Sequence, residues 1–482
     1  MMMSFPVQLQ VDRQQSEPVF RQIYLRFKEA ITQRILLPDT RVPSVRALAS
    51  ELGVARGTVE NAYAQLVAEG YLQSRGQSGT YVSDQLLRGL ASIPAEPSKP
   101  RQATQINHAF ALETESPQPF QLGLPALDAF PYGLWARIIN QQTRAATRAS
   151  LGHPPATGLL VLREAIASYL QLSRGFHCLP EQVFICPGYQ ALLDLVISTL
   201  LHPGDAVWLE DPGYPVTQQL CREAQLRNEP IPVDGEGINL GAAIDKVPDA
   251  RAVIVTPAHQ SPTGVALSLP RRLALLEWAA EQQSWIIEDD YDSEFRYQGR
   301  PLPSLKSLDR QGRVLYAGTF SKVMFPALRI AYLVVPKELV DRFTQRCRLR
   351  ACTVPPLIQS SVAEFIRQGH FYRHLKRMRH VYPERRAWLV EALESQLGDV
   401  LQVEEQAGGI QLLARLDKNY SDRLVVTLAH QQGLAIQALS DWQIDISGGN
   451  GLLLGFTNLQ SADDAKRQVS RLASIIRFMG RE

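Results

Sequence analysis

After about residue 120 the chain alternates short apolar runs with stretches of helical periodicity, and this alternation limits the fold more than any other feature. Such a pattern is typical of βαβ units, whose strands pair in parallel and whose helices cover both faces of the sheet. We therefore predict a large three-layer α/β fold with a mostly parallel sheet. Its strands are expected at residues 182–186, 206–209, 252–256, 284–288, 314–316 and 330–335.

The first 84 residues have a different pattern. Apolar residues recur at helical spacing over 18–36, which predicts a first helix. A short helix from Ser44, a turn at Gly53 and a second helix from about Ala55 follow. Residues 70–82 then alternate around glycines, as a small β-hairpin does. This order predicts a winged helix-turn-helix.

Between the two patterns lies a polar stretch without sustained periodicity. It contains Pro94, Pro97, Pro100 and Pro117, which favour an extended linker. We therefore predict a DNA-binding domain at 1–84, a linker at 85–119 and an α/β domain at 120–482.

Composition limits the partners and the compartment. The 482 residues are 45% hydrophobic and 20% charged, as expected for a folded protein of two or more domains. The net charge of +2 means that any contact with DNA is local. The five cysteines form no CxxC pair, so neither disulfides nor a metal site are expected. With no leader-like or membrane-spanning stretch, a cytoplasmic protein is expected.

The predicted helix-turn-helix carries a set of candidate DNA contacts. The start of its second helix presents polar side chains to base edges, while nearby basic and hydroxyl groups hold phosphates. The alternative is a helical subdomain that contacts another protein. The candidates are Arg56, Thr58 and Asn61 on the second helix, Ser44 and Arg46 on the first, Arg75, Gly79 and Thr80 in the wing, and Arg41.

In the α/β half, chemically active residues follow predicted strands. Asp289 follows the apolar run at 285–287, where α/β proteins place ligands. Lys322 follows another strand and can reach the same crevice. A further strand runs into a helix at the sequence CPGYQ, which points backbone N–H groups at an anion. The candidate anion ligands are Gly188, Tyr189, Gln190, Thr319, Ser321 and Arg329.

These residue types are the ones that pyridoxal phosphate requires. The cofactor needs a lysine for a Schiff base, an acid at the pyridine nitrogen, a phosphate cradle and an aromatic face. Lys322 and Asp289 supply the first two. Tyr214, in the sequence DPGYP, is the candidate stacking face and Tyr291 the candidate partner of the phenolic oxygen. The loop TPAHQSPTG brings His259 and Ser261 near the ring.

Each of these signals has an ordinary structural explanation. A single lysine is usually a solvated surface charge, and the sequence EDDYD is more often an acidic turn or a metal loop. A histidine such as His259 is more often a structural hydrogen-bonding residue than a catalyst. Their occurrence together, in this order, favours the cofactor site.

Two resemblances support this interpretation. The segment LPDTRVPSVRALASELGVARGTVENAYAQLVAEGYLQSRGQSGTYV closely resembles the GntR family winged helix. In that family the arginines matching Arg46 and Arg56 contact DNA, whereas Glu60 stands where the family has a further arginine. From about Gln121 onward the chain resembles fold-type I aminotransferases. The motifs that carry this second resemblance are EDPGYP, TPAHQSPTG, EDDYDSEFRY, GTFSKVMFPALRIAYLVVP and LLLGFTNL.

Together the two halves resemble the MocR/GabR subgroup of GntR regulators. The resemblance implies a head-to-tail homodimer and gives roles to the residues that match the subgroup's cofactor set. Lys322 matches its cofactor lysine and Asp289 its pyridine aspartate. Tyr291 matches its phenolic tyrosine and Tyr214 its stacking tyrosine.

Two departures bear on what the protein senses. Related aminotransferases hold the substrate carboxylate with an arginine just before a strand like 452–456, yet no arginine occurs between Arg423 and Arg467. They also commonly have Asn where this chain has Ser261. The shorter serine side chain reaches less far towards the cofactor ring. Bidentate capture of a carboxylate is therefore not expected from that position.

Three functions remain open on this basis. The leading hypothesis is a regulator whose DNA binding responds to an amine or amino acid that exchanges onto the cofactor at Lys322. The second is a working aminotransferase with an appended DNA-binding domain, in which Lys322 also acts as general base. In the third, pyridoxal phosphate is itself the effector, and the absent arginine favours this.

Overall fold

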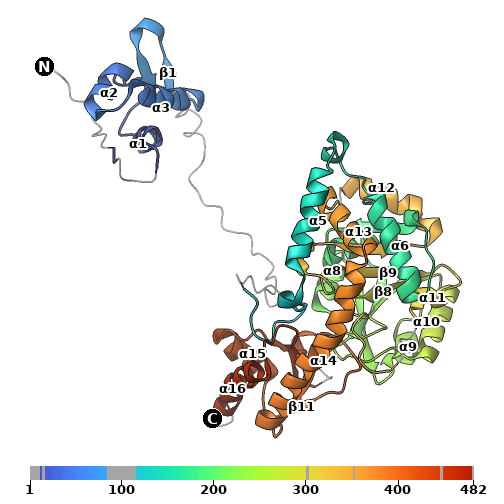
Figure 1. The fold of residues 1–482 in the computed structure, drawn as a ribbon. Helices are drawn as coiled ribbons and strands as arrows, with labels where there is room; N and C mark the ends of the chain where they lie inside the picture. The colour runs from blue at the N-terminus through green and yellow to red at the C-terminus, as the bar shows by residue number, and fades with distance from the viewer. Residues whose placement is uncertain are drawn as a thin grey trace. The chain divides into compact units, whose positions relative to one another are not determined.

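The computed structural model describes residues 11–12, 17–83, 116–299, 303–350, 353–445 and 449–479. The chain divides into two compact units, Met1–Phe110 and Ala111–Glu482, coloured blue and cyan to red in Figure 1. Most of the predicted linker lies outside the described residues, so its boundaries stay predictions. Pro119, the last residue of that linker, already accepts a hydrogen bond from the Ala435 backbone.

The first unit has the predicted order of elements. Ser44 caps α2, where its Oγ accepts the Ala47 N–H at 3.2 Å, and Gly53 ends that helix in the left-handed conformation that glycine tolerates. The first helix is shorter than predicted, because Arg34 takes a left-handed φ of 59°. The elements are α1 (Val19–Thr32), α2 (Val45–Leu52), α3 (Arg56–Ala68), β1 (Leu72–Ser74) and β2 (Thr80–Val82).

A central eight-stranded sheet organises the second unit, with the order β3-β10-β9-β8-β7-β4-β5-β6. Strands β5, β4, β7, β8 and β9 run parallel, while β10 is antiparallel to both β3 and β9. All six predicted strands are confirmed. The strands are β3 (Val183–Cys186), β4 (Ala206–Asp211), β5 (Arg227–Asp234), β6 (Gly237–Ile238), β7 (Ala252–Val255), β8 (Trp285–Asp290), β9 (Val314–Thr319) and β10 (Ala331–Val334).

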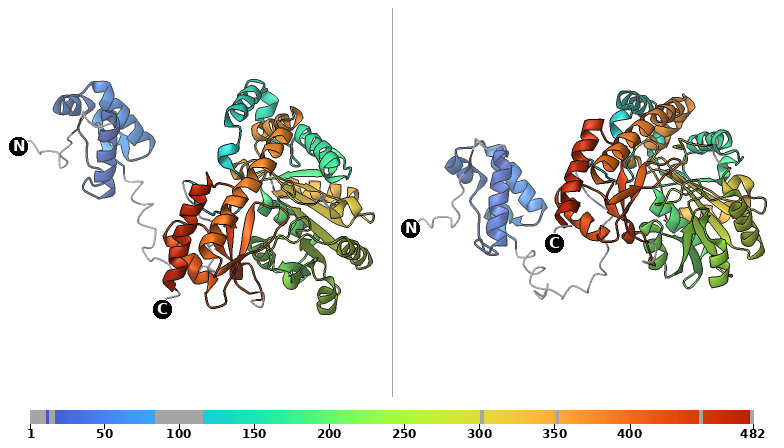
Figure 2. Two further views of the ribbon diagram at one scale, coloured as in Figure 1. Left: turned by 60° about the horizontal axis from the view of Figure 1, so that its bottom comes forward. Right: turned by 90° about the horizontal axis from the view of Figure 1, so that it is seen from below.

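Helices cover both faces of this sheet (Figures 1 and 2). Successive side chains of β3 enter different cores: Phe184 packs in one cluster and Ile185 in another. The predicted three-layer fold is therefore confirmed. The helices of this layer arrangement are α5 (Tyr132–Arg144), α6 (Leu160–Arg174), α7 (Tyr189–Leu200), α8 (Pro215–Glu223), α9 (Leu240–Lys246), α10 (Leu269–Glu281), α11 (Leu305–Leu308), α12 (Val340–Arg350) and α13 (Pro356–Arg367).

A smaller sheet with its own helices forms the C-terminal part, which the sequence did not predict. Its order is β11-β12-β14-β13. The long helix α14 (His370–Leu397) leads into it and packs along α16 (Figure 2). The remaining elements are β11 (Leu401–Val403), β12 (Gln411–Leu416), α15 (Asp422–Gln431), β13 (Gln437–Ala438), β14 (Gly451–Gly455) and α16 (Ala462–Met479).

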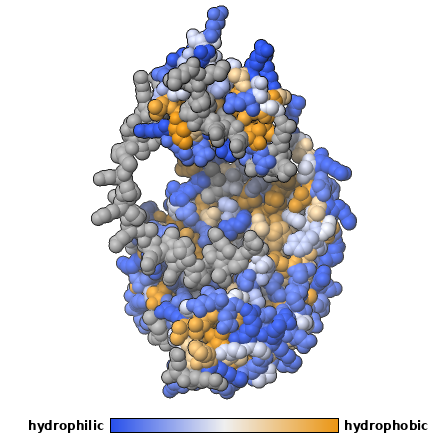
Figure 3. Space-filling view, turned by 90° about the vertical axis from the view of Figure 1, so that its left-hand side faces the viewer, coloured by the Kyte–Doolittle hydropathy of each residue, from blue (hydrophilic) through white to orange (hydrophobic). Residues whose placement is uncertain are grey.

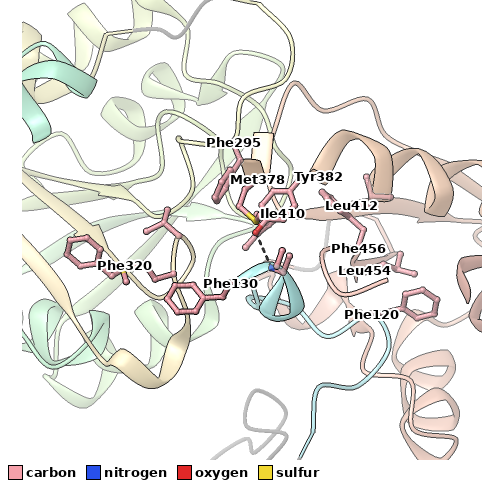
Figure 4. Close-up of a cluster of buried hydrophobic side chains, with 14 of the residues drawn as sticks. Phe120, Phe130, Phe295, Phe320, Met378, Tyr382, Ile410, Leu412, Leu454 and Phe456 are labelled. Carbon is pink, nitrogen blue, oxygen red and sulfur yellow. Dashed lines mark hydrogen bonds between the residues drawn. The ribbon is translucent and has the colours of Figure 1, made fainter. Parts of the chain in front are cut away.

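The segment 120–130 joins the large sheet to the small one (Figure 4). Phe120 and Phe130 are buried in the same core cluster as Phe456. The Tyr382 hydroxyl of α14 accepts the Ala126 N–H at 3.1 Å. This stretch, which directly follows the predicted linker, is therefore fixed between the two sheets.

Hydrophilic residues predominate on the face drawn in Figure 3, and apolar residues gather in separate patches. Among the residues that the structure describes, no helix combines the length and apolar character needed to cross a bilayer. Cys178, Cys186, Cys221 and Cys347 are buried. Cys352 lies outside the described residues.

Candidate functional site

Lys322 lies in the loop that follows β9, and its side chain contacts the segment 120–130. Its Nζ donates to the Gly123 carbonyl oxygen at 2.9 Å. A Cβ at Gly123 would stand 2.5 Å from Nζ, so only glycine leaves room for this contact. Burial lowers the pKa of Lys322, which the nearby carboxylates of Asp292 and Asp289 partly oppose. Burial thus shifts Lys322 towards the neutral amine, which is the nucleophilic form.

Asp289 lies near the carboxyl end of β8 and is 8% exposed. Burial raises the pKa of its carboxyl to about 8, and neighbouring Asp290 and Glu210 act in the same direction, whereas a hydrogen bond from Tyr189 opposes the shift. A cation placed against this buried carboxyl would stabilise its ionised form and lower its pKa again. Asp289 therefore suits a protonated ring nitrogen.

The candidate ring residues line one small cavity. Asp289, Tyr214, Tyr189 and Ser261 share it with Glu210. The Tyr214 side chain is 37% exposed, and its ring centroid is 6.1 Å from that of Tyr189. The structure thus brings the predicted stacking tyrosine and the predicted pyridine acid together. It adds the Tyr189 side chain, since the sequence pointed only to its backbone.

The candidate anion ligands meet at the edge of the sheet where β9 and β3 end and β10 begins. Thr319 and Cys186 both lie opposite Ala331 in the strand register, so the loops after them start at the same level. Gly188 precedes α7 with φ 93°, and a Cβ there would stand 2.8 Å from the Arg329 guanidinium. Gln190 lies in the first turn of α7, and the Ser321 N–H donates to Thr319 Oγ1 at 3.1 Å. The helix terminus and the guanidinium form a cradle for an anion.

His259 lies beside Tyr291 rather than in the small cavity. Its Nδ1 is 3.1 Å from the Tyr291 hydroxyl and 3.2 Å from Asp292 Oδ2. Burial raises the pKa of Tyr291 well above its ordinary value, so the hydroxyl keeps its proton. A hydrogen bond with Ser261 opposes that shift. The three candidates Tyr291, His259 and Ser261 therefore form one hydrogen-bonding group.

Sequence reasoning missed Glu210, which fixes the loop that carries His259. Its Oε2 accepts the Thr256 N–H at 3.1 Å and the Thr256 hydroxyl at 2.6 Å. Burial raises the pKa of Glu210 to about 7. The motif EDPGYP contains this residue next to the aspartate and tyrosine, but a glutamate inside a strand carries no signal of its own.

Gly123 was also missed, because its partner Lys322 stands far along the chain and a single glycine in a loop is common. No local pattern connects the two positions.

The candidate DNA contacts lie on the surface of the first unit. Arg41, Arg46, Arg56, Asn61 and Arg75 are exposed, and Thr58, Gly79 and Thr80 are partly exposed. Ser44 is exposed as well, but its hydroxyl already caps α2.

Ion pairs already hold two of these arginines. Arg56 Nε lies 2.9 Å from Glu60 Oε1. Glu60, which stands where the GntR family has an arginine, thus pairs with the candidate DNA contact Arg56. Arg75 pairs with Asp39 and lies 4.7 Å above the Tyr81 ring. The Arg41 side chain packs against Gly79, where a Cβ would stand 3.0 Å from Nε. Arg41 thus packs against the wing.

These residues fit pyridoxal phosphate. Lys322 offers a nucleophilic amine, Asp289 a buried acid for the ring nitrogen, and Gly188 with Arg329 an anion cradle that any Cβ at Gly188 would fill. The combination of one amine, one acid and one anion cradle matches the three polar ends of this cofactor.

Each of the two units matches a known protein family. Residues 129–448 match the family described as aminotransferase class I and II, and residues 20–82 match the bacterial regulatory proteins of the gntR family. The chain is 36% identical to the probable rhizopine catabolism regulatory protein MocR of Rhizobium meliloti over 465 residues, covering 94% of this chain and 92% of that protein.

Two further likenesses extend this result. The HTH-type pyridoxine biosynthesis transcriptional regulator PdxR of Corynebacterium glutamicum is 31% identical over 462 residues, covering 95% of each chain. The kynurenine aminotransferase of Pyrococcus horikoshii, solved with PMP, superposes with a TM-score of 0.69 at 26% identity, over 76% of this chain and 92% of that one.

Proposed function

The chain belongs to the gntR family of bacterial regulators, in the MocR/GabR subgroup that carries an aminotransferase class I and II domain, and we propose that its second unit is a ligand sensor that controls DNA binding by the first. DNA binding lies with the winged helix and pyridoxal phosphate with the aminotransferase-like unit. The sensed molecule is an amine or amino acid that reacts at Lys322, or the cofactor itself.

In this proposal the described residues divide the work of holding the cofactor. When bound, pyridoxal phosphate supplies an aldehyde that combines reversibly with amines. Asp289 pairs with the ring nitrogen, Tyr214 stacks on the ring and Tyr291 donates to the phenolic oxygen. Lys322 provides the amine that anchors the group. The phosphate is held by the remaining candidates, Gly188, Tyr189, Gln190, Thr319, Ser321 and Arg329.

The observation that favours a sensor over an enzyme concerns the arginine that reaches the end of β14, because its guanidinium is already paired with an aspartate. Residues 424–466 contain no arginine. Arg385 of α14 reaches the Thr457 carbonyl just after β14, but its guanidinium is paired with Asp128 at 2.6 Å. Among the described residues, the arginine that reaches the end of β14 is thus already paired and is not available to hold a substrate carboxylate.

Two alternatives have support of their own. The complete set of cofactor residues supports a working aminotransferase. The likeness to the Corynebacterium glutamicum regulator of pyridoxine biosynthesis supports pyridoxal phosphate as the effector.

The subgroup resemblance also supports a head-to-tail homodimer in the cytoplasm, where the DNA lies. Analytical ultracentrifugation of the full chain tests the dimer, and a monomer at micromolar concentration would contradict it.

The deciding experiment compares binding and turnover in the same preparation. Affinity for DNA upstream of its own gene is measured with pyridoxal phosphate and with a panel of amines, while keto-acid conversion is followed in parallel. The proposal expects a ligand-dependent affinity with slow conversion. Specific DNA binding that ignores every ligand contradicts it, and rapid amino transfer favours the aminotransferase.

A further inference from the structure

The His259 imidazole is held by oxygen atoms from two neighbouring residues of one loop. Nδ1 lies 3.1 Å from the Tyr291 hydroxyl and 3.2 Å from Asp292 Oδ2. The His259 residue is 6% exposed and Asp292 is 1% exposed. At this burial both contacts are shielded from water, which strengthens the hydrogen bond between His259 and Tyr291.

The C-terminal subdomain fixes the other side of the ring. Gly409 has φ 91°, and a Cβ there would stand 2.2 Å from His259 Cε1. The Gly409 N–H donates to the Phe295 carbonyl at 2.8 Å, and its own carbonyl accepts the Tyr297 hydroxyl. The imidazole thus stands in a space that only glycine leaves open.

The neighbours of Nδ1 decide which atom carries the proton. A carboxylate oxygen accepts hydrogen bonds, so Asp292 Oδ2 beside Nδ1 favours the tautomer with hydrogen on that nitrogen. That N–H then faces the Tyr291 oxygen as a donor. In that tautomer the Tyr291 oxygen accepts from Nδ1, which leaves the hydroxyl hydrogen free to point away from the imidazole, on the side of Ser261.

From this geometry we propose that His259 is a positioning residue that orients the Tyr291 hydroxyl as a hydrogen-bond donor to the phenolic oxygen of the cofactor. His259 acts through Tyr291 and does not touch the cofactor. The inference rests on the proposed cofactor site. It gives the His259 side chain a role that explains why its loop is anchored by Glu210 through Thr256 and Gln260.

The test follows the absorbance of the holoprotein as a function of pH. A donor at the phenolic oxygen stabilises negative charge there and lowers the pH at which the Lys322-linked chromophore loses its proton. Tyr291→Phe should therefore raise the midpoint. His259→Phe keeps an aromatic ring without a donor and should raise it in the same direction, by about half a pH unit.

Matched variants separate orientation from packing. The side-chain amide of His259→Asn can donate from near the position of Nδ1, so its midpoint should stay near the wild-type value. His259→Gln places its amide near the Nε2 position and should behave like His259→Phe. Circular dichroism and thermal unfolding identify variants that fold, and His259→Gln replaces His259→Phe if the latter does not.

The double variant gives the sharpest result. Adding His259→Phe to Tyr291→Phe should cause no further shift, because there is no hydroxyl left to orient. Additive shifts, or a His259→Phe midpoint equal to the wild-type value, would overturn the inference. A wild-type protein that binds no pyridoxal phosphate would instead overturn the proposed function.

Discussion

The cofactor pocket and the DNA-binding surface use charged residues in opposite ways. The pocket gathers groups from distant parts of the chain, Gly123 to Arg329, and burial shifts the pKa values of Asp289 and Lys322. The winged helix presents exposed arginines from a short stretch, with ion pairs such as Arg56 to Glu60 open to solvent. Exposed pairs contribute little to stability, whereas buried groups contribute strongly through their protonation state.

Because of this difference, effects on the cofactor site and effects on DNA binding can be separated by substitution. Substitutions in the pocket are expected to change cofactor binding, its pH dependence and the stability of the second unit. Substitutions on the winged helix are expected to change DNA affinity or the stability of the first unit, and to leave the cofactor site unchanged.

The largest expected effect is that of Lys322→Ala on cofactor retention. Without the amine, no borohydride-reducible bond to pyridoxal phosphate forms, and affinity falls by about 100-fold or more. Mass spectrometry after borohydride treatment measures this. Lys376→Ala, at an exposed position of α14, is the control and should label normally. Undiminished labelling of Lys322→Ala would refute the assignment.

Asp289→Asn should have opposite effects on the two forms of the protein: it should stabilise the apoprotein against unfolding and weaken the complex with the cofactor. Unfolded, Asp289 titrates near its ordinary pKa of 3.8, and folded near about 8. Between these values the folded apoprotein binds more protons than the unfolded chain, so its free energy of unfolding falls as pH rises.

The substitution removes this loss and should stabilise the apoprotein by about 1 to 3 kcal/mol at pH 8 while weakening the cofactor complex. Thermal unfolding across pH 5 to 8 (about the window of the shift) tests this. Asp341→Asn, at an exposed position, is the matched control. An apoprotein destabilised by Asp289→Asn at pH 8 would show that the carboxyl is ionised and well paired.

Arg56→Ala should weaken operator binding by about 1 to 3 kcal/mol without changing the cofactor absorbance. Glu60→Gln removes the pairing carboxylate and keeps the side-chain length, so it should preserve or increase DNA affinity. Fluorescence anisotropy with labelled operator measures both. If the two variants lose affinity equally, the ion pair, rather than Arg56 itself, is what binding requires.

The smallest expected effect is that of Ser44→Ala. Loss of the cap on α2 should cost the first unit about 1 kcal/mol of stability, seen as a lower unfolding midpoint of the winged helix. Ser44→Asp retains a capping oxygen and should restore stability but repel the DNA backbone. Equal stability of all three proteins would show that the cap contributes nothing.

Local patterns were sufficient for the elements that bury continuous apolar runs. Six of the strands from β3 to β10 were predicted because each contains an apolar run such as Ala252–Val255, whereas β5 and β6 were not predicted. The winged helix was predicted because glycines such as Gly53 mark its turns. The second sheet was missed because β11 and β13 are short and β12 lies far in sequence from its partner β14.

The site was predictable to the extent that its residues follow strands. Lys322, Asp289 and Gly188 all follow or end strands of one sheet, so the fold brings them together. Gly123 and Gly409 could not be predicted, because their importance comes from side chains, Lys322 and His259, that approach from distant segments. Such contacts are set by tertiary packing alone.

The central claim, that the cofactor site controls DNA binding, is tested most directly by operator affinity in wild type and Lys322→Ala. Each protein is titrated with labelled operator as apoprotein, with pyridoxal phosphate, and with pyridoxal phosphate plus each amine of the panel. The account predicts that ligand changes the wild-type dissociation constant by about tenfold, while Lys322→Ala shows one value throughout. Identical wild-type constants under all conditions, or an undiminished response in Lys322→Ala, would contradict it.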